Sequence, residues 1–219
     1  MSPVPTRKIA SLYRKRKSRE PYDVVLIVCE GAKTEPSYFT ALKKELRLSS
    51  TNIHICGKEC GSAPINVVDY AIDEFKKNGS YDRVYCIFDK DDHETYEAAL
   101  DKVRRTKLRR AKFIAITSVP CFEFWILLHF DSSTRPYGAS AKRSACNELL
   151  RYLRKYITNY QKGNDIFGQT YPKISDAIKH AEIREKNRKA SGSDNPSTKV
   201  HELVKYLQNL KKDGEHEGG

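Results

Sequence analysis

The sequence lacks any apolar run of the roughly 20 residues that a membrane-spanning helix needs. Its most apolar later stretch, Phe122 to Phe130, is interrupted by Glu123 and His129. The basic residues near the start are not followed by the apolar segment with a small-residue end that marks a secretory signal. We therefore expect a cytoplasmic protein without membrane contact.

Cysteine patterns that would staple a fold or bind zinc are also lacking. Of the six cysteines, Cys29 and Cys86 fall in apolar stretches, where a free thiol behaves as a small hydrophobe. Cys56 and Cys60 form a C-x3-C pair beside His54, but no second pair completes a tetrahedral zinc site. We expect neither a disulfide framework nor zinc.

Acidic residues are fewer than basic ones. The chain has 28 Asp and Glu against 40 Lys and Arg, a net charge of +12, and this excess favours binding to polyanions. Basic residues cluster at 7–19, 102–112 and 179–189. Tyrosines among the later basic residues, at 152, 156, 160 and 171, could stack on unpaired bases. The competing interpretation is a set of solvated helix faces with the tyrosines packed inward.

The most regular feature that is present is an apolar run at 24–28, which ends at Glu30 and Gly31. Because it contains no polar alternation, the run predicts a strand buried on both faces. Glu30 then stands at the carboxyl end of this strand, the edge where ligands bind in open α/β sheets. Glu30 is therefore either a site residue or the first solvated residue after a core strand.

Strand and helix patterns alternate through the first half of the chain and predict an α/β fold with a mainly parallel sheet and right-handed crossovers. The expected strands are 23–29, 52–56, 83–88 and 112–117, and the expected helices are 35–48, 64–75 and 93–109. Beyond residue 117 the alternation stops. Helices are expected at 120–130, 147–160, 175–189 and 197–210, with loops at 163–172 and 191–196.

A second buried run, at 83–88, also ends in acids, in the sequence D-K-D-D. Asp89 and Asp91 occupy alternate positions after an extended segment and would point the same way. Helix capping explains one of these acids but not three. If the two strands are neighbours, Glu30 joins them in a site suited to Mg²⁺ or Mn²⁺ and to phosphoryl chemistry. A nucleic-acid phosphodiester is the expected substrate class.

Four ordered motifs resemble the RloB-like family. They are V-L-I-V-C-E-G-A-K-T-E-P-S-Y-F at 25–39, I-F-D-K-D-D at 87–92, C-F-E-F-W-I-L-L-H-F at 121–130 and N-P-S-T-K-V-H-E-L-V at 195–204. That family is similar to Toprim proteins, including OLD-family nucleases, whose sheet carries a Glu-Gly after its first strand and a D-x-D after a later one. The resemblance implies a Toprim-like α/β core at 21–130 with a helical extension packed on it at 131–212. Composition adds a basic arm at 1–20 and a disordered tail at 213–219.

The resemblance also implies the roles of the acids. Glu30 would be the general acid/base or a metal-facing carboxylate, and Asp89 and Asp91 the principal metal ligands. Toprim sequences commonly place an acid four residues after the motif glutamate, whereas Thr34 stands there in this chain. Further ligand candidates are Asp92, Glu35 and Glu123, and Glu123 could instead be a buried structural hydrogen-bond partner.

The candidate contacts to nucleic acid are basic or hydroxyl side chains near the motifs. Asn195 is the expected cap of the last helix, from whose N-terminus Ser197 and Thr198 could contact phosphate. The full set is Lys33, Lys90, Arg104, Arg105, Lys173, Ser197, Thr198 and Lys199.

The leading hypothesis is a metal-dependent nuclease, with RNA (tRNA included) ranked ahead of DNA. The resemblance implies that it is an effector of bacterial anti-phage defence or abortive infection beside an ABC-type ATPase encoded nearby. The alternative is a non-catalytic nucleic-acid-binding or regulatory subunit. A haloacid-dehalogenase-type phosphatase ranks low, because the D-x-D follows a later strand and His93 comes next. The oligomeric state stays open.

Overall fold

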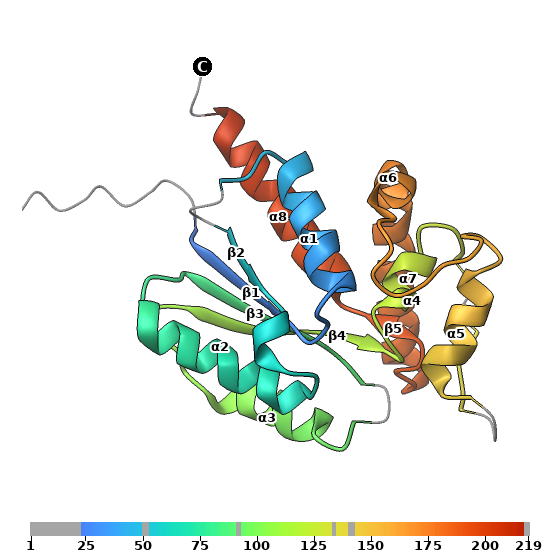
Figure 1. Ribbon diagram of the computed structural model, residues 1–219, viewed down its shortest axis with the longest axis horizontal. Helices are drawn as coiled ribbons and strands as arrows, with labels where there is room; N and C mark the ends of the chain where they lie inside the picture. Colours follow the sequence, from blue (N-terminus) through green and yellow to red (C-terminus); the bar gives the residue numbers. More distant parts are fainter. Residues whose placement is uncertain (1–22, 50–52, 91–92, 133–134, 140–142, 217–219) are drawn as a thin grey trace, which may run out of the picture.

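A five-stranded sheet forms the centre of the protein (Figure 1). The computed structural model describes residues 23–49, 53–90, 93–132, 135–139 and 143–216. The predicted basic arm, Asp91 and Asp92 lie outside these ranges. The strands are β1 (Val25–Cys29), β2 (Ile53–Cys56), β3 (Arg83–Asp89), β4 (Lys112–Val119) and β5 (Ser197–Thr198), in the order β2-β1-β3-β4-β5.

The first four strands are parallel and β5 runs antiparallel to β4, which confirms the predicted α/β class with a mainly parallel sheet. Helices α2 (Pro64–Asn78) and α3 (Tyr96–Arg105) cover one face, while α1 (Thr34–Glu45) and α8 (Val200–His216) cover the other (Figure 1). This arrangement, with its C-terminal helix, is consistent with a Toprim-like fold.

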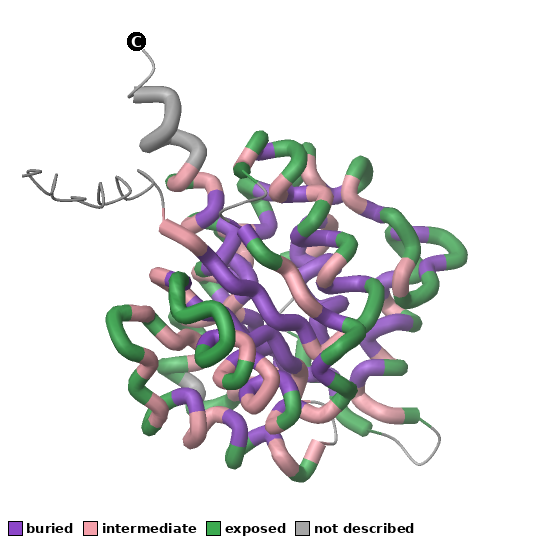
Figure 2. The backbone as a smooth tube through the Cα atoms, turned by 60° about the vertical axis from the view of Figure 1, so that its left-hand side comes forward, coloured by how far each residue is buried: buried purple, intermediate pink, exposed green. Residues whose placement is uncertain are grey.

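Burial on both faces explains the unbroken apolar run of β1, in which every residue is buried (Figure 2). Val25 and Ile27 point into a core cluster shared with α1 and α8, and Leu26 and Val28 into a second cluster shared with α2 and α3. A sheet covered by helices on both sides selects such strands, since polar alternation would bury polar groups.

The remaining helices lie beyond the parallel part of the sheet. They are α4 (Glu123–Leu127), α5 (Ala145–Leu153), α6 (Phe167–Thr170) and α7 (Ile174–Ser191), with short 3₁₀ turns η1 (Lys58–Cys60) and η2 (Tyr171–Lys173). In the part of the chain that the structure describes, no helix has the length and apolar character to cross a membrane.

Several predicted boundaries were wrong. The helix expected at 93–109 begins at Tyr96 and ends at Arg105, and the one expected at 147–160 stops at Leu153. The stretch 120–130 contains only five residues of α-helix. Its run of apolar residues reflects burial of the whole segment and not a long helix. The predicted loop at 163–172 holds α6 and the start of η2.

The last helix begins at Val200, because Ser197 and Thr198 pair with β4. The Thr198 hydroxyl accepts a hydrogen bond from Val200 N at 3.2 Å, whereas the Asn195 side chain bonds the backbone of Tyr137, so Asn195 is not the cap. The helix continues to His216, where a disordered tail was expected from 213. A helix that is already nucleated by packing gains one backbone hydrogen bond for each residue added.

Cys121 and Cys146 form a disulfide, which the expectation of no disulfide framework did not anticipate. The two residues are 25 positions apart, and the packing of α4 against α5 brings them together. Sequence spacing alone does not reveal this pairing. Cys29, Cys56, Cys60 and Cys86 are free.

Candidate metal and phosphate site

The two acidic strand ends meet at one edge of the sheet. β1 and β3 are neighbours, with Cys29 opposite Ile87, and Glu30 N donates to Ile87 O at 2.9 Å. Glu30 Oε2 in turn accepts a hydrogen bond from Asp89 N at 2.9 Å. The condition set by the sequence, that the two strands be adjacent, is therefore met.

His93 holds the other oxygen of the Glu30 carboxylate. Its Nε2 lies 2.9 Å from Glu30 Oε1. With one oxygen on His93 and the other on Asp89 N, the carboxylate is oriented by two protein donors. His93 was predicted as the start of a helix and used to rank a phosphatase low, but not as a site residue, although its place directly after D-K-D-D was a usable signal.

Gly31 is required for a close approach within the site. A Cβ at this position would lie 1.9 Å from Glu35 Oε2, so any side chain would displace the Glu35 carboxylate. Glu35 comes from the first turn of α1 and is 7% exposed. Gly31 thus leaves room for the Glu35 carboxylate in the pocket that Glu30 also lines.

A pocket of about 450 Å³ opens at this edge of the sheet. It contains three of the predicted acids together with side chains that the sequence analysis missed. The lining residues are Glu30, Gly31, Ala32, Glu35, Gly57, Lys58, Gly61, Ser62, Asp89, His93 and Lys162. Cations and acids therefore line one cavity, as a site for a metal bound to phosphate requires.

Burial perturbs two of the carboxyl groups. Desolvation, reinforced by the charge of Glu123, raises the pKa of Glu35 to about 7. Burial raises the pKa of Asp89 well above its ordinary value, and Glu35 adds repulsion. Asp89 Oδ1 is buried and has no hydrogen-bond partner in the described part of the protein. An unpaired buried carboxylate oxygen is costly, and a bound cation would reverse that cost.

A hard divalent cation fits these donors. Asp89 and Glu35 would hold it, with Glu30 beside them. Glu30, Glu35 and Asp89 line the pocket, but they are not found as a close group of three ligand atoms. Among the described residues, the close group that is found is Cys121, Glu123 and Cys146, whose ligand atoms lie within 4.8 Å of one another. Water and substrate oxygens would therefore complete the coordination, as is usual for Mg²⁺. Asp91, the other predicted ligand, lies outside the described ranges.

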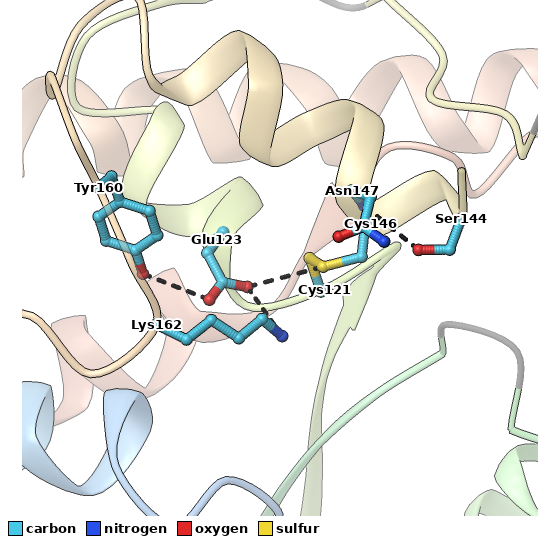
Figure 3. The surroundings of a disulfide bond; sticks show 7 residues. All are labelled: Cys121, Glu123, Ser144, Cys146, Asn147, Tyr160 and Lys162. Atoms are coloured by element: carbon cyan, nitrogen blue, oxygen red, sulfur yellow. Dashed lines mark hydrogen bonds and ion pairs between the residues drawn. A yellow bond between two sulfur atoms is a disulfide. The ribbon is translucent and has the colours of Figure 1, made fainter. Parts of the chain in front are cut away.

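Glu123 lies beside the disulfide and near Lys162 (Figure 3). It is 1% exposed, its Oε1 accepts a hydrogen bond from Tyr160 Oη at 3.3 Å, and its Oε2 lies 3.6 Å from Lys162 Nζ. While the two sulfurs are bonded to each other they are not thiolate ligands, so a metal at the Cys/Glu group would require the reduced form. Glu123 is thus a buried hydrogen-bond acceptor whose charge also acts on Glu35 and Asp89.

Thr34, which stands where Toprim sequences commonly carry an acid, anchors the loop that bears Lys162. Its Oγ1 accepts a hydrogen bond from Gly163 N at 2.9 Å. Gly163 has φ +91°, and a Cβ there would lie 3.1 Å from Lys33 Cδ. Thr34 therefore helps to hold the loop whose Lys162 lines the pocket.

The structure does not gather the predicted nucleic-acid contacts at this pocket. Lys90 Nζ lies 2.7 Å from Asp194 Oδ2, and Lys173 Nζ lies over the Phe130 ring at 4.4 Å. Lys33 is exposed at the start of α1. Arg104 and Arg105 both pair with Asp101 at the end of α3.

Ser197, Thr198 and Lys199 belong to β5 and its junction with α8. Thr198 is 3% exposed, and its hydroxyl lies 3.1 Å from Ser118 Oγ as well as capping α8. The Thr198 hydroxyl is therefore engaged within the fold, and its contact to phosphate stays a prediction. The roles of the other candidates stay predictions.

Fold and pocket together define an α/β protein with a carboxylate-lined site at the carboxyl edge of a parallel sheet. A family model described as RloB-like protein matches residues 25–207, and the chain belongs to this family. A search of curated proteins and a search of solved structures found no match.

Proposed function

We propose that the protein is a Toprim-type phosphodiesterase that uses Mg²⁺ or Mn²⁺ to cleave nucleic acid, with RNA (tRNA included) ahead of DNA. The observation that carries this proposal is the buried, unpartnered Asp89 Oδ1 in a pocket that Glu30 and Glu35 also line. The net charge of +12 supports a polyanionic substrate. The resemblance to defence nucleases supports a cytoplasmic anti-phage effector that acts beside an ABC-type ATPase.

Each group in the pocket has a role in this proposal. Asp89 and Glu35 hold the cation, which when bound stabilises charge on the phosphoryl oxygens and lowers the pKa of water. Glu30, oriented by His93 and Asp89 N, accepts a proton from the attacking water. Lys58 and Lys162 attract the phosphate into the pocket.

The test uses Asp89→Asn and Glu30→Gln, with the exposed Glu45→Gln as a matched control. End-labelled RNA and DNA are incubated with Mg²⁺, Mn²⁺ or a chelator. We expect the two site variants to lose about 10²-fold or more of the cleavage rate while circular dichroism stays unchanged. The control should cut normally. If both site variants cut as fast as the wild type, the site assignment is wrong.

A cellular experiment would identify the substrate. The wild type and Glu30→Gln are expressed with and without the neighbouring gene product during phage infection, and RNA and DNA ends are sequenced. Ends that depend on Glu30 would name the substrate and the activity together.

The second candidate function is a non-catalytic nucleic-acid-binding or regulatory subunit. It is favoured by the Glu30 carboxylate, both of whose oxygens already accept hydrogen bonds from protein donors, as in a purely structural acid. Salt-sensitive binding without cleavage, and a melting temperature that divalent metal does not change, would support this function against the first.

A further inference from the structure

Among the described residues, the outer edge of β4 has no strand partner along most of its length. Seven of the eight residues of β4, 112–118, pair with β3, whereas only Ser118 and Val119 pair with β5. Lys112 N donates to Asp82 O, and Ser118 O accepts from Lys90 N, so the even-numbered residues of β4 direct their backbone groups toward β3. In a parallel pair the odd-numbered residues then direct theirs to the opposite edge.

Phe113 and Ala115 present backbone groups at this edge that the sheet does not use. Their N–H and C=O groups have no sheet partner among the described residues. Nearer the carboxyl end of β4, Thr117 O accepts a hydrogen bond from Lys199 N at 2.9 Å, so the edge is closed there. An unpaired strand edge of this kind is a template for another extended chain.

A groove of about 790 Å³ runs along the same edge. Phe113 and Ala115 belong to the core cluster on the α3 side of the sheet, whereas Ile114 belongs to the cluster on the α8 side. All three nevertheless line this groove. Side chains from both faces of one strand can line one groove only if it lies along the strand's edge.

The groove is apolar on its floor and basic on its rim. Leu100 and Val103 of α3 lie beside Phe113 on the floor. The rim carries three cations, Arg104, Lys107 and Lys199, against one acid, Glu97. Arg104 is also paired with Asp101, but an exposed pair of this kind is worth little and can exchange partners.

We propose that this edge binds an extended acidic segment of a partner protein, which adds a strand to β4 with its backbone on Phe113 and Ala115. Alternate apolar side chains of that segment would pack on the groove floor, and its carboxylates would face the basic rim. The proposal is independent of the proposed catalytic function, because the groove and the carboxylate pocket share no lining residue.

The charge of the rim disfavours a second copy of this chain as the occupant, since two such rims would meet and repel. Nucleic acid would satisfy the cations, but it would leave the backbone groups of Phe113 and Ala115 without the paired donors and acceptors that an extended peptide supplies. The strand-edge geometry therefore favours a peptide over both.

The experiment uses an eight-residue fluorescent peptide of alternating Val and Glu on the full-length protein. Its control peptide has the same residues with two adjacent central amides methylated, which removes a central N–H donor from each edge of the strand and places a methyl group there. Lys107→Glu changes the rim, and the exposed Lys44→Glu on α1 makes the same charge change elsewhere. Amide hydrogen exchange is followed at Phe113 and Ala115, with the Ile114 amide, which faces β3, as an internal control.

We expect saturable binding, at least tenfold weaker for the methylated peptide and for Lys107→Glu, and unchanged for Lys44→Glu. Exchange at Phe113 and Ala115 should slow at least tenfold with peptide, while Ile114 stays slow throughout. Equal binding of the methylated peptide, unchanged exchange at Phe113 and Ala115, or no binding at about 1 mM peptide overturns the proposal. A nucleic-acid surface would give a different result. In that case Lys107→Glu abolishes binding of a single-stranded oligonucleotide, the Val/Glu peptide leaves amide exchange at Phe113 and Ala115 unchanged, and the proposal is overturned.

Discussion

Glu35 and Asp89 show how a single glycine and a buried strand end create a charged site. Gly31 leaves the space that the Glu35 carboxylate occupies, and β3 carries Asp89 to the same pocket. Both carboxyl groups then sit where burial and the charges of neighbouring acids favour the neutral form. Such groups destabilise the folded chain when ionised and become useful when a cation compensates them.

The first residue-scale prediction concerns the pH dependence of stability. Because the pKa of Glu35 rises from 4.5 to about 7 on folding, its neutral form contributes stability that is fully present below pH 4.5. That stability is lost as the pH rises through about 7, and amounts to about 3 kcal/mol. Glu35→Gln should therefore melt above the wild type at pH 8 in the absence of metal, and less so at pH 5.

Divalent metal provides the check on this prediction. At pH 8, Mg²⁺ should raise the melting temperature of the wild type more than that of Glu35→Gln, because only the wild type gains compensation of the ionised carboxyl. Glu45→Gln, on the same helix and exposed, should follow the wild type in every condition. A variant that tracks the wild type from pH 5 to pH 8 would refute the burial argument.

At the scale of elements, the short helix α4 couples the sheet to the helical extension. It contacts β4 and α5, and the disulfide between Cys121 and Cys146 ties the turn before α4 to the start of α5. Glu123 is the first residue of α4 and lies beside that bond (Figure 3), and its carboxylate pairs with Lys162, which lines the pocket. A change in the bond would therefore act close to the carboxylates.

Reduction of this disulfide should destabilise the protein. Closing a loop of 25 residues contributes about 3 kcal/mol in the chain-entropy account. We expect dithiothreitol to lower the melting temperature by roughly 6–12 °C in a chain of this length. The Cys121→Ser/Cys146→Ser double variant should not respond to the reductant.

Thiol counting tests the bond directly. The denatured wild type should show four reactive thiols before reduction and six after, since Cys29, Cys56, Cys60 and Cys86 are the free ones and the chain has six cysteines. Six thiols without reductant, together with no change in melting temperature, would show that the pair is not bonded in solution.

At the scale of the whole molecule, the net charge of +12 predicts binding to nucleic acid that depends steeply on salt. For single-stranded RNA, four neutralised phosphates would give a slope of about −3 in a plot of log K against log salt. Lys58→Ala, at the rim of the carboxylate pocket, should reduce the slope by about 0.7, whereas Lys44→Ala on α1 should leave it unchanged. Fluorescence anisotropy from 50 to 300 mM salt measures both. A slope near zero would exclude electrostatic binding.

The sequence by itself determined the parallel core and the two acidic strand ends. These follow from local patterns: strands buried on both faces need unbroken apolar runs, and a strand that ends at an acid places it at the sheet edge. Pro64 at the start of α2 and Gly79 at its end, with φ +59°, likewise act within a few residues. Helix boundaries near β5 and α4 failed because sheet pairing and burial overrode the local pattern there.

Only the tertiary structure decided which side chains complete the site and which edge stays open. His93 reaches Glu30 across 63 positions, Lys162 comes from a loop that Thr34 anchors, and Cys121 meets Cys146 through helix packing. Within the described part of the chain, most of the β4 edge stays open because β5 is only two residues long. Each of these depends on contacts between distant segments, which no local periodicity records.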